Sequence, residues 1–407
     1  MLWEKKLTQW ANDVKTRANL PARLVLWNGE QLDFGTFAAP QVTLRVNSAS
    51  ALPLLMAPSL DNLGEAYVKG KIDIEGALGD IINIGYALAR NTVTGGAGRL
   101  ARIRRHFTHT KAADAEAIQY HYDISNEFYQ LWLDRNMVYS CAYFESGDED
   151  LDTAQLKKID HILTKIRLQP GQRLLDIGCG WGALVIRAAS KFGAQCVGVT
   201  LSERQFELAT QRVREAGLQD RIEIRIQDYR DVTGQFDRIT SVGMFEHVGR
   251  KNLPMYFQRV HDLLTEDGVA MNHGITSTDP GSGETALGGG NFIDRYVFPR
   301  GELPHISLAL EAMQRGGLEP LDIESLRRHY ARTLQCWTER LEAHTPEARA
   351  LVDDEKFRIW RLYLAGCAYA FEHDDVSLFQ IVCRRAGGSA TTLPWSRRYM
   401  YEQPLPR

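Results

Sequence analysis

The chain has 407 residues, of which 44% are hydrophobic and 24% are charged, and its formal net charge is −3 at pH 7. These values are ordinary for a globular protein of two or three domains. The small net charge gives no general attraction to nucleic acid, and no apolar run approaches the roughly 18 residues that a membrane-spanning helix needs.

The first twenty residues are amphipathic and include acidic side chains, without the apolar stretch of a signal peptide. We therefore expect a cytoplasmic protein. None of the six cysteines forms a C-x-x-C pair, so we expect no zinc ribbon, redox pair or disulfide, and we predict no metal site. Three cysteines lie in apolar runs that are typical of a protein core, namely Cys196, Cys367 and Cys383.

Residues 1–95 predict a small α+β module. Two strands are expected over 22–35 around Asn28-Gly29, which is a strong hairpin signal, and 41–47 alternates like a third strand. Such a module either packs and assembles the protein or handles lipid. The other predicted elements are a short helix or loop at 48–59, a pair of strands at 64–76 and a helix at 77–90.

A basic linker follows at 96–115. It is either a solvated linker helix or a segment that meets an anionic membrane surface, where each basic residue contributes on the order of 1 kcal/mol. No acidic residue interrupts its basic residues, which are Arg99, Arg102, Arg104, Arg105 and Lys111.

From 116 to 388, strands and helices alternate, which predicts an α/β fold with a doubly wound, mostly parallel sheet. Residues 389–407 form a C-terminal tail. Strands are predicted at 172–177, 194–200, 221–226, 236–242, 267–275, 319–325 and 376–384. Helices are predicted at 153–166, 182–192, 202–216, 252–264, 307–316, 330–345 and 350–371.

The stretch LLDIGCGWGAL at 174–184 predicts a strand, a tight glycine turn and a helix N-terminus. Its G-x-G-x-G spacing differs from the pattern of pyrophosphate sites, and Asp176 stands two residues before Gly178. An acid there can hold a cationic or hydroxyl-bearing group, as in sites for S-adenosylmethionine (SAM). The alternative is a glycine turn that binds no ligand.

Polar residues also follow the next predicted strands, at the sheet edge where ligands of such folds bind. After the second strand, Ser202 is a candidate helix cap, and Gln205 either completes a capping box or faces a ribose. After the third, Asp228 and Tyr229 either contact an adenine or form a polar turn. After the fourth comes the pair Glu246-His247, at a strand end where chemistry is done, although a lone pair of this kind is usually a helix cap or a surface pair.

The region from about 115 to 388 resembles the cyclopropane-fatty-acyl-phospholipid synthases, which are SAM-dependent lipid methyltransferases related to the mycolic acid cyclopropane synthases. The resemblance implies a class I methyltransferase sheet of seven strands with the last one antiparallel. The module at 1–95 is similar to the accessory domain of the phospholipid enzymes, which favours a phospholipid substrate. The motifs that carry the resemblance are YDISNEFYQLWLDRNMVYSCAYFE (122–145), LLDIGCGWG (174–182), GVTLSERQ (198–205), MFEHVG (244–249), NHGITS (272–277) and HYARTL (329–334).

The resemblance also implies roles for individual residues. Bicarbonate would be surrounded by Cys141, Glu246, His273, Ile275 and Tyr330, with Cys141 and Ile275 contributing backbone groups. In the alternative interpretation, His273 and Tyr330 are structural residues of the core that bind no ligand. SAM would be bound by Tyr139, Ser140, Asp176, Gly178, Gly180, Thr200, Leu201, Gln205, Asp228 and Tyr229, although the segment 228–230 differs from the mycolate relatives.

Aromatic side chains are expected to line the acyl pocket and to stabilise a carbocation, unless they are plain core. These are Phe144, Phe292, Tyr296 and Phe298. The glycine-rich stretch Thr276–Asn291 is either a lid over that pocket or an ordinary surface loop.

The expected reaction is transfer of a methylene group from SAM to the cis double bond of an unsaturated phospholipid acyl chain, with bicarbonate removing the proton that closes the cyclopropane ring. The alternatives are a methyl-branching lipid methyltransferase, a small-molecule N-methyltransferase and a non-catalytic lipid carrier. The resemblance suggests a homodimer that binds the inner membrane face peripherally and no nucleic acid.

Overall fold

The computed structural model describes residues 2–56, 59–92, 124–280, 290–298, 301–388 and 393–402. The basic linker and most of the glycine-rich stretch lie outside the described residues. The chain forms two compact units. The N-terminal unit comprises Met1–His106, Glu284–Pro299 and Thr345–Tyr369, and the sheet unit comprises Phe107–Gly283, Arg300–His344 and Ala370–Arg407. Two segments inside the predicted region 116–388 therefore pack with the N-terminal residues.

The N-terminal unit is built around a sheet with the strand order β2-β1-β3-β4. β1 (Ala22–Val25) and β2 (Gln31–Asp33) form the predicted hairpin, and β3 (Val42–Val46) pairs parallel with β1. The hydrophobic core of the unit also includes Ala365, which comes from the C-terminal half of the chain. Besides α3 (Leu60–Val68), the helices of the unit within the described residues are α1 (Leu2–Arg17), α2 (Leu52–Met56), α4 (Leu78–Thr92), α11 (Gly290–Tyr296), α14 (Thr345–Leu351) and most of α15 (Asp354–Glu372).

The predicted strand pair at 64–76 is wrong for its first half. The chain there forms α3 (Leu60–Val68), and only β4 (Ile72–Glu75) is a strand. Ser59 caps the helix by accepting a hydrogen bond from the Asn62 amide, and Leu63 and Tyr67 are buried four residues apart on one face. Helical spacing and a capping serine outweigh the glycines in this segment.

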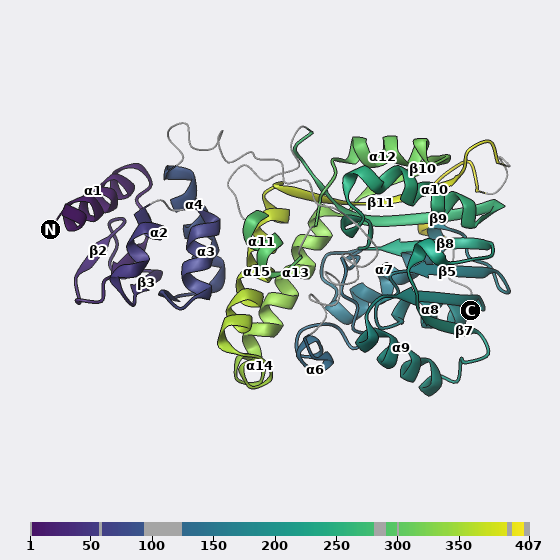
Figure 1. Ribbon diagram of the computed structural model, residues 1–407, viewed down its shortest axis with the longest axis horizontal. Coiled ribbons are helices and arrows are strands. Elements are labelled where there is room, and N and C mark those ends of the chain that lie inside the picture. Colours follow the sequence, from purple (N-terminus) through teal and green to yellow (C-terminus); the bar gives the residue numbers. More distant parts are fainter. Residues whose placement is uncertain are drawn as a thin grey trace. The chain divides into compact units, whose positions relative to one another are not determined.

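The sheet unit contains all seven predicted strands, in the order β10-β11-β9-β8-β5-β6-β7 (Figure 1). β11 pairs antiparallel with both of its neighbours, and the remaining pairs are parallel, which confirms the predicted methyltransferase fold class. The strands are β5 (Arg173–Ile177), β6 (Gln195–Thr200), β7 (Ile222–Ile226), β8 (Phe236–Val242), β9 (Leu264–Ser277), β10 (Leu318–Ser325) and β11 (Val376–Arg385).

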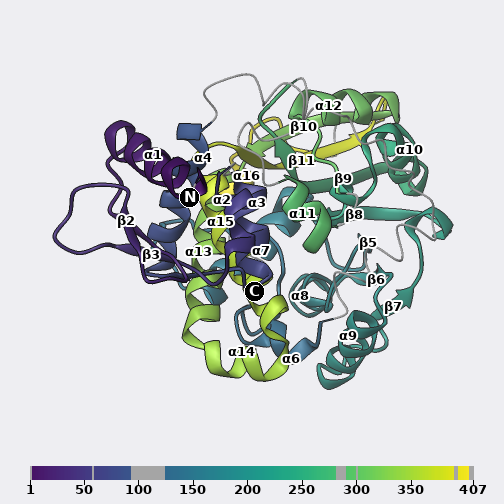
Figure 2. The same cartoon turned by 60° about the vertical axis from the view of Figure 1, so that its left-hand side comes forward.

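Helices cover both faces of this sheet, each over its own hydrophobic core. α7 (Leu151–Lys165) and α8 (Ala183–Phe192) pack on one face, and α10 (Leu253–Leu263) and α12 (Ile306–Arg315) pack on the other. Figure 2 shows α10 and α12 on the side of the sheet opposite to α8. The unit also contains α6 (Asn126–Gln130), α9 (Glu203–Glu215), α13 (Arg327–Ala343) and α16 (Tyr399–Glu402).

The topology places a crevice between β5 and β8. The chain runs outward from β5 through β6 to β7, then returns to β8 on the other side of β5. Ligands of doubly wound sheets bind at the carboxyl ends of the strands where the order reverses in this way.

Candidate functional site

The glycine turn lies at the carboxyl end of β5. Gly178, Gly180 and Gly182 have φ values of 79°, 53° and 83°, in the left-handed region that favours glycine. The amides of Gly178 and Cys179 both donate to the carbonyl of Val199 on β6, at 3.0 Å. The turn therefore brings bare backbone to the crevice immediately before α8 begins.

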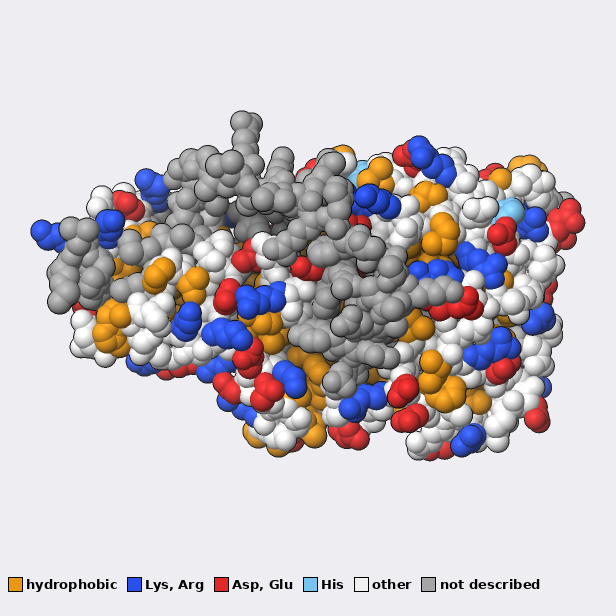
Figure 3. Space-filling model, viewed as in Figure 1, with side chains coloured by type: hydrophobic (Ala, Val, Ile, Leu, Met, Phe, Trp, Pro, Cys, Tyr) orange, Lys and Arg blue, Asp and Glu red, His pale blue; other side chains and the backbone are white. Residues whose placement is uncertain are grey.

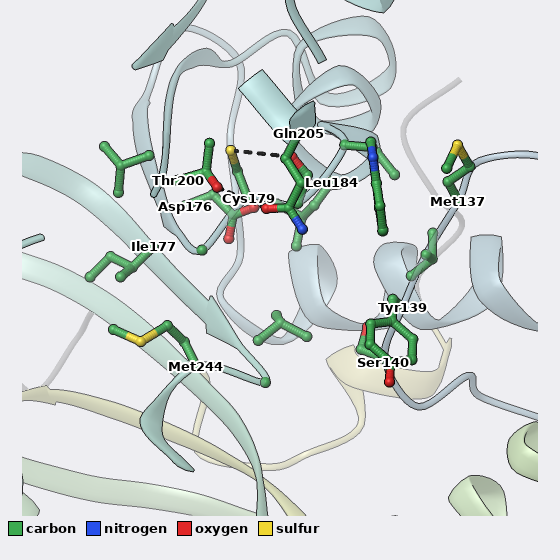
Figure 4. Close-up of a pocket in the computed structure, with 18 of the residues that line it drawn as sticks. Met137, Tyr139, Ser140, Asp176, Ile177, Cys179, Leu184, Thr200, Gln205 and Met244 are labelled. Carbon is green, nitrogen blue, oxygen red and sulfur yellow. Dashed lines mark hydrogen bonds between the residues drawn. The ribbon is translucent and has the colours of Figure 1, made fainter. Parts of the chain in front are cut away.

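A cavity opens beside this turn (Figure 4). In Figure 4, Asp176, Thr200 and Gln205 come from the strand ends and α9, while Tyr139 and Ser140 come from a separate stretch of chain. The cavity brings together nine of the ten predicted cofactor residues, namely Tyr139, Ser140, Asp176, Gly178, Gly180, Thr200, Leu201, Gln205 and Tyr229.

Asp228 is the predicted cofactor residue that does not line this cavity. Its carboxylate accepts two hydrogen bonds from the Arg230 guanidinium, at 2.8 and 2.6 Å, and a third from the Arg230 amide. Asp228 therefore forms a polar turn with Arg230, whereas the adjacent Tyr229 lines the cavity, and a contact of Asp228 with the cofactor stays a prediction.

Each of the two predictions for the segment after β6, a capping box and a Gln205 that faces a ligand, is partly met in the structure. Ser202 caps α9 by accepting from the Gln205 amide. The Gln205 side chain does not complete a capping box, because Thr200 Oγ1 accepts from the Ser202 amide at 3.1 Å and donates to Gln205 Oε1 at 2.8 Å. Gln205 is thereby held in the cavity wall.

Buried charges of both signs lie in the cavity wall. Asp176 accepts a hydrogen bond from Thr240 Oγ1 at 2.7 Å, and burial raises the pKa of its carboxyl to about 6. The ammonium of Lys158 donates to Ser140 Oγ at 2.6 Å. Sequence analysis did not select Lys158, although it lies on α7 among apolar residues that pack on the sheet.

A second polar cluster begins just after β8, in the turn η4 (Phe245–His247). The Glu246-His247 pair divides between the two sites, because His247 lines the first cavity and Glu246 turns toward β9. Glu246 Oε1 accepts from the Ile275 amide at 2.6 Å, so that amide is engaged by the protein itself. Burial raises the pKa of the Glu246 carboxyl to about 7.

His273 lies on β9, two residues before Ile275. Its Nδ1 atom is 3.2 Å from Gln380 Nε2 on β11. If the amide nitrogen donates there, the ring proton lies on Nε2. Burial holds the pKa of the imidazole well below its usual value, so the ring is neutral. Within the described residues, neither His273 Nε2 nor Glu246 Oε2 has a hydrogen-bond partner.

Cys141 and Tyr330 are joined to this cluster through backbone contacts. The Cys141 thiol approaches the Leu326 carbonyl at 3.8 Å, and the Leu326 amide donates to Leu378, which pairs with Ile275 in the sheet. The Tyr330 amide donates to Leu326 at 3.0 Å at the start of α13. Burial raises the pKa of the Cys141 thiol, which argues against a thiolate nucleophile.

Residues 109–381 match the family described as mycolic acid cyclopropane synthetase. The chain belongs to this family. Residues 9–96 match a separate domain of unknown function. As a member of this family, the protein is a SAM-dependent methyltransferase.

Relatives and solved structures agree with this membership. A probable fatty acid methyltransferase of Pseudomonas putida is 48% identical over 386 residues, which cover 94% of this chain and 97% of that protein. The cyclopropane-fatty-acyl-phospholipid synthase of Escherichia coli K12 is 40% identical over 265 residues, covering 65% and 66% of the two chains. The structure of mycolic acid cyclopropane synthase CmaA1 with S-adenosylhomocysteine and CTAB superposes with a TM-score of 0.63 at 36% identity, covering 67% of this chain and 98% of that one.

The structure does not gather the four aromatics predicted for the acyl pocket in one unit. Phe144 is buried in the sheet unit, where its amide donates to His329 Nδ1 at 3.1 Å. Phe292, Tyr296 and Phe298 belong to the N-terminal unit. The Phe292 amide donates to Asp61 on α3 at 2.9 Å, which fixes α11 to that helix.

The described residues contain no group of three His, Cys, Asp or Glu side chains placed to hold a metal ion. In the same part of the chain, no helix combines the length and the hydropathy that a membrane span requires.

Proposed function

We propose that this family member transfers a methylene group from SAM to the cis double bond of an unsaturated acyl chain in a membrane phospholipid, forming a cyclopropane ring. The observation that carries the proposal is the pair of buried polar atoms, Glu246 Oε2 and His273 Nε2, that have no partner among the described residues. Buried polar atoms without a partner lower the stability of a protein, and these two fit a small polar ligand that accepts from one group and donates to the other.

Bicarbonate fits this pair by its chemistry. When bound, it supplies a small base that takes a proton from the reacting lipid. Glu246 would accept the hydrogen of the bound ion, and the neutral His273 would donate to one of its oxygens. The Ile275 amide holds Glu246 in place rather than pointing to a ligand. These residues therefore orient the base and keep water from replacing it.

The rest of the reaction depends on position and exclusion of water. An alkene is a weak nucleophile, so the methyl of the sulfonium must be held in line with the π bond, and positioning of this kind lowers a barrier by several kcal/mol. The π electrons form the new carbon–carbon bond, S-adenosylhomocysteine leaves, and a carbocation remains on the acyl chain. Loss of a proton from the transferred methyl closes the ring. Buried apolar surroundings protect the cation from water.

The decisive experiment is mass spectrometry of lipids after incubation of the purified protein with SAM, bicarbonate and vesicles of an unsaturated phospholipid. We expect a gain of one CH2 unit with loss of the double bond, and a product that co-migrates with a cyclopropane standard in gas chromatography. Glu246→Gln should lower the rate on the order of 100-fold while SAM still binds. An unchanged lipid mass despite bound SAM would contradict the proposal.

A methyl-branching reaction is the second candidate, because the Pseudomonas putida relative that matches almost the whole chain is described as a probable fatty acid methyltransferase. SAM with a trideuterated methyl group helps to separate the two. Ring closure removes one deuteron from the transferred carbon, whereas loss of a proton from a neighbouring carbon leaves all three. A product that retains three deuterons and an alkene would favour branching.

We further propose that the protein attaches peripherally to the inner face of the membrane and works there as a homodimer. The support is the family resemblance of the N-terminal module and the basic linker, together with the phospholipid substrate proposed above. Sedimentation-velocity centrifugation of the purified protein tests the dimer, since a monomeric mass at micromolar concentration would contradict it.

A further inference from the structure

Lys158 is a buried cation that forms no direct ion pair with a carboxylate among the described residues, although the charges of Asp134 and Asp176 act on it from beyond ion-pair distance. The residue is 2% exposed, and its ammonium donates to the hydroxyl of Ser140 at 2.6 Å. An ammonium has three hydrogens to donate, and among the described residues this neutral hydroxyl is its only acceptor. Buried charges in proteins are normally paired, because an isolated charge in the interior is strongly unfavourable.

The same helix shows how a buried lysine is normally accommodated. Lys165 lies two turns further along α7, equally buried, and its ammonium contacts the carboxylates of Glu324 and Asp322. Lys158 has no such contact in the described structure, and burial lowers the pKa of its ammonium to about 8. The difference between the two lysines suggests that an anion from outside the chain completes the environment of Lys158.

The position of Lys158 indicates which anion this is. Lys158, Ser140 and Asp176 all line the cavity beside the glycine turn, so its lining carries both a buried cation and a buried acid, whose charges also act on each other. The amino-acid end of SAM is a zwitterion, with one ammonium and one carboxylate. We propose that Lys158, together with the Ser140 hydroxyl that it holds, binds the carboxylate of SAM, while Asp176 faces the ammonium.

Bicarbonate is the other carboxylate-like ligand to consider, since the charge of Lys158 also acts on His273. Lys158 and Ser140 line the cavity of the glycine turn, whereas Glu246 and His273 do not. The geometry therefore favours SAM. The inference rests on SAM dependence and is independent of the acceptor that we propose.

Isothermal titration calorimetry with SAM and with decarboxylated SAM tests the assignment, without any lipid present. The wild-type protein should bind SAM on the order of 30-fold more tightly than decarboxylated SAM, because removal of one partner of a buried charge pair has at least this effect. Lys158→Met and Lys158→Gln should lose SAM affinity and bind the two ligands within about threefold of each other. Lys165→Met is the matched control, with a lower stability and an unchanged preference for SAM.

Three results would overturn the proposal. The first is equal affinity of the wild-type protein for the two ligands, a comparison that needs no variant and so does not depend on folding of the mutants. The second is a preference for SAM that remains in both Lys158 variants, which would make Lys158 a structural residue. The third is a preference for SAM that remains in the Lys158 variants while these variants bind bicarbonate more weakly than the wild type, which would assign Lys158 to the site of Glu246 and His273. Because no product is measured, failure of the proposed cyclopropanation would leave these results unaffected.

Discussion

Glu246 is a carboxyl group whose protonation is set by its surroundings. One oxygen accepts from the Ile275 amide, the other has no partner among the described residues, and burial raises the pKa from 4.5 to about 7. A proton is therefore bound more tightly in the folded state than in the unfolded one. The resulting contribution to stability is fully present below the unfolded pKa of 4.5 and is lost as the pH rises through about 7.

This predicts a pH-dependent effect of Glu246→Gln on the free energy of unfolding. Between pH 4.5 and pH 8 the variant should gain about 3 kcal/mol relative to the wild type, since each pKa unit corresponds to about 1.4 kcal/mol. Urea unfolding in bicarbonate-free buffer measures this difference. Glu207→Gln, an exposed change on α9, is the control and should show no such trend. A constant difference across this pH range would contradict the raised pKa.

At the scale of elements, β9 and η4 are packed against each other through a glycine. A side-chain carbon at Gly274 would lie 2.0 Å from the ring of the buried Phe245, which precedes Glu246. The absence of a side chain on β9 thus lets the turn come close enough for Glu246 to accept from Ile275. Tight packing of this kind cannot absorb an added methyl without a shift of the turn.

We therefore expect Gly274→Ala to destabilise the protein by about 1–3 kcal/mol and to reduce lipid turnover more than SAM affinity. Urea unfolding, calorimetric SAM titration and the lipid assay measure the three quantities. Adding Phe245→Leu should restore part of the stability, because the smaller side chain makes room for the methyl. Full activity of the single variant would show that η4 does not need this close approach.

At the scale of the whole molecule, the N-terminal unit is completed by segments from the C-terminal half. Arg358 on α15 forms ion pairs with Asp73 on β4 and with Asp354, and its guanidinium lies over the ring of Tyr67 at 4.9 Å. Its side chain is 14% exposed, whereas those of Asp73 and Asp354 are 43% and 48% exposed, so the ion pairs are only partly shielded from solvent. The unit therefore depends on residues almost 300 positions apart in the sequence.

Arg358→Met should lower the free energy of unfolding by about 1–2 kcal/mol, because it removes the hydrogen bond to the Tyr67 carbonyl and two partly shielded ion pairs. The same change should make residues 1–92 more accessible to limited proteolysis. Arg315→Met removes an exposed pair with Glu311 and serves as the control, for which no measurable loss is expected. Equal behaviour of the two variants would contradict the role of Arg358.

The membrane attachment proposed above also concerns the whole chain. The face in Figure 3 shows basic and acidic side chains interspersed among the described residues, without a large field of one sign. We expect attraction to anionic lipid from the basic linker, which lies outside the described residues, because no acidic residue interrupts its basic residues. Reversal of charge at Arg102, Arg104 and Arg105 should weaken co-sedimentation with anionic vesicles roughly 100-fold. Unchanged sedimentation would remove the linker from membrane binding.

Most of the sheet unit could be predicted from the sequence, because each strand is a short apolar run and each turn carries its own glycine or capping signal. The sequence also identified the residues around the glycine turn, since consecutive strand ends meet at one edge of a parallel sheet. It failed at α3, where glycines masked helical spacing. Local pattern has no information on how distant segments pack, so only the tertiary structure placed α11 and α15 in the N-terminal unit.

The same limit applies to the site. Asp228 stands at the expected strand end, but its bond to Arg230 depends on side-chain geometry that spacing does not encode. Lys158 and Lys165 are both buried on α7, and the sequence makes no distinction between them. The strands that lie beneath the helix decide whether a buried lysine contacts a carboxylate of the chain, as Lys165 does, or is free to bind one from a ligand, as we propose for Lys158. That information exists only once the sheet has formed.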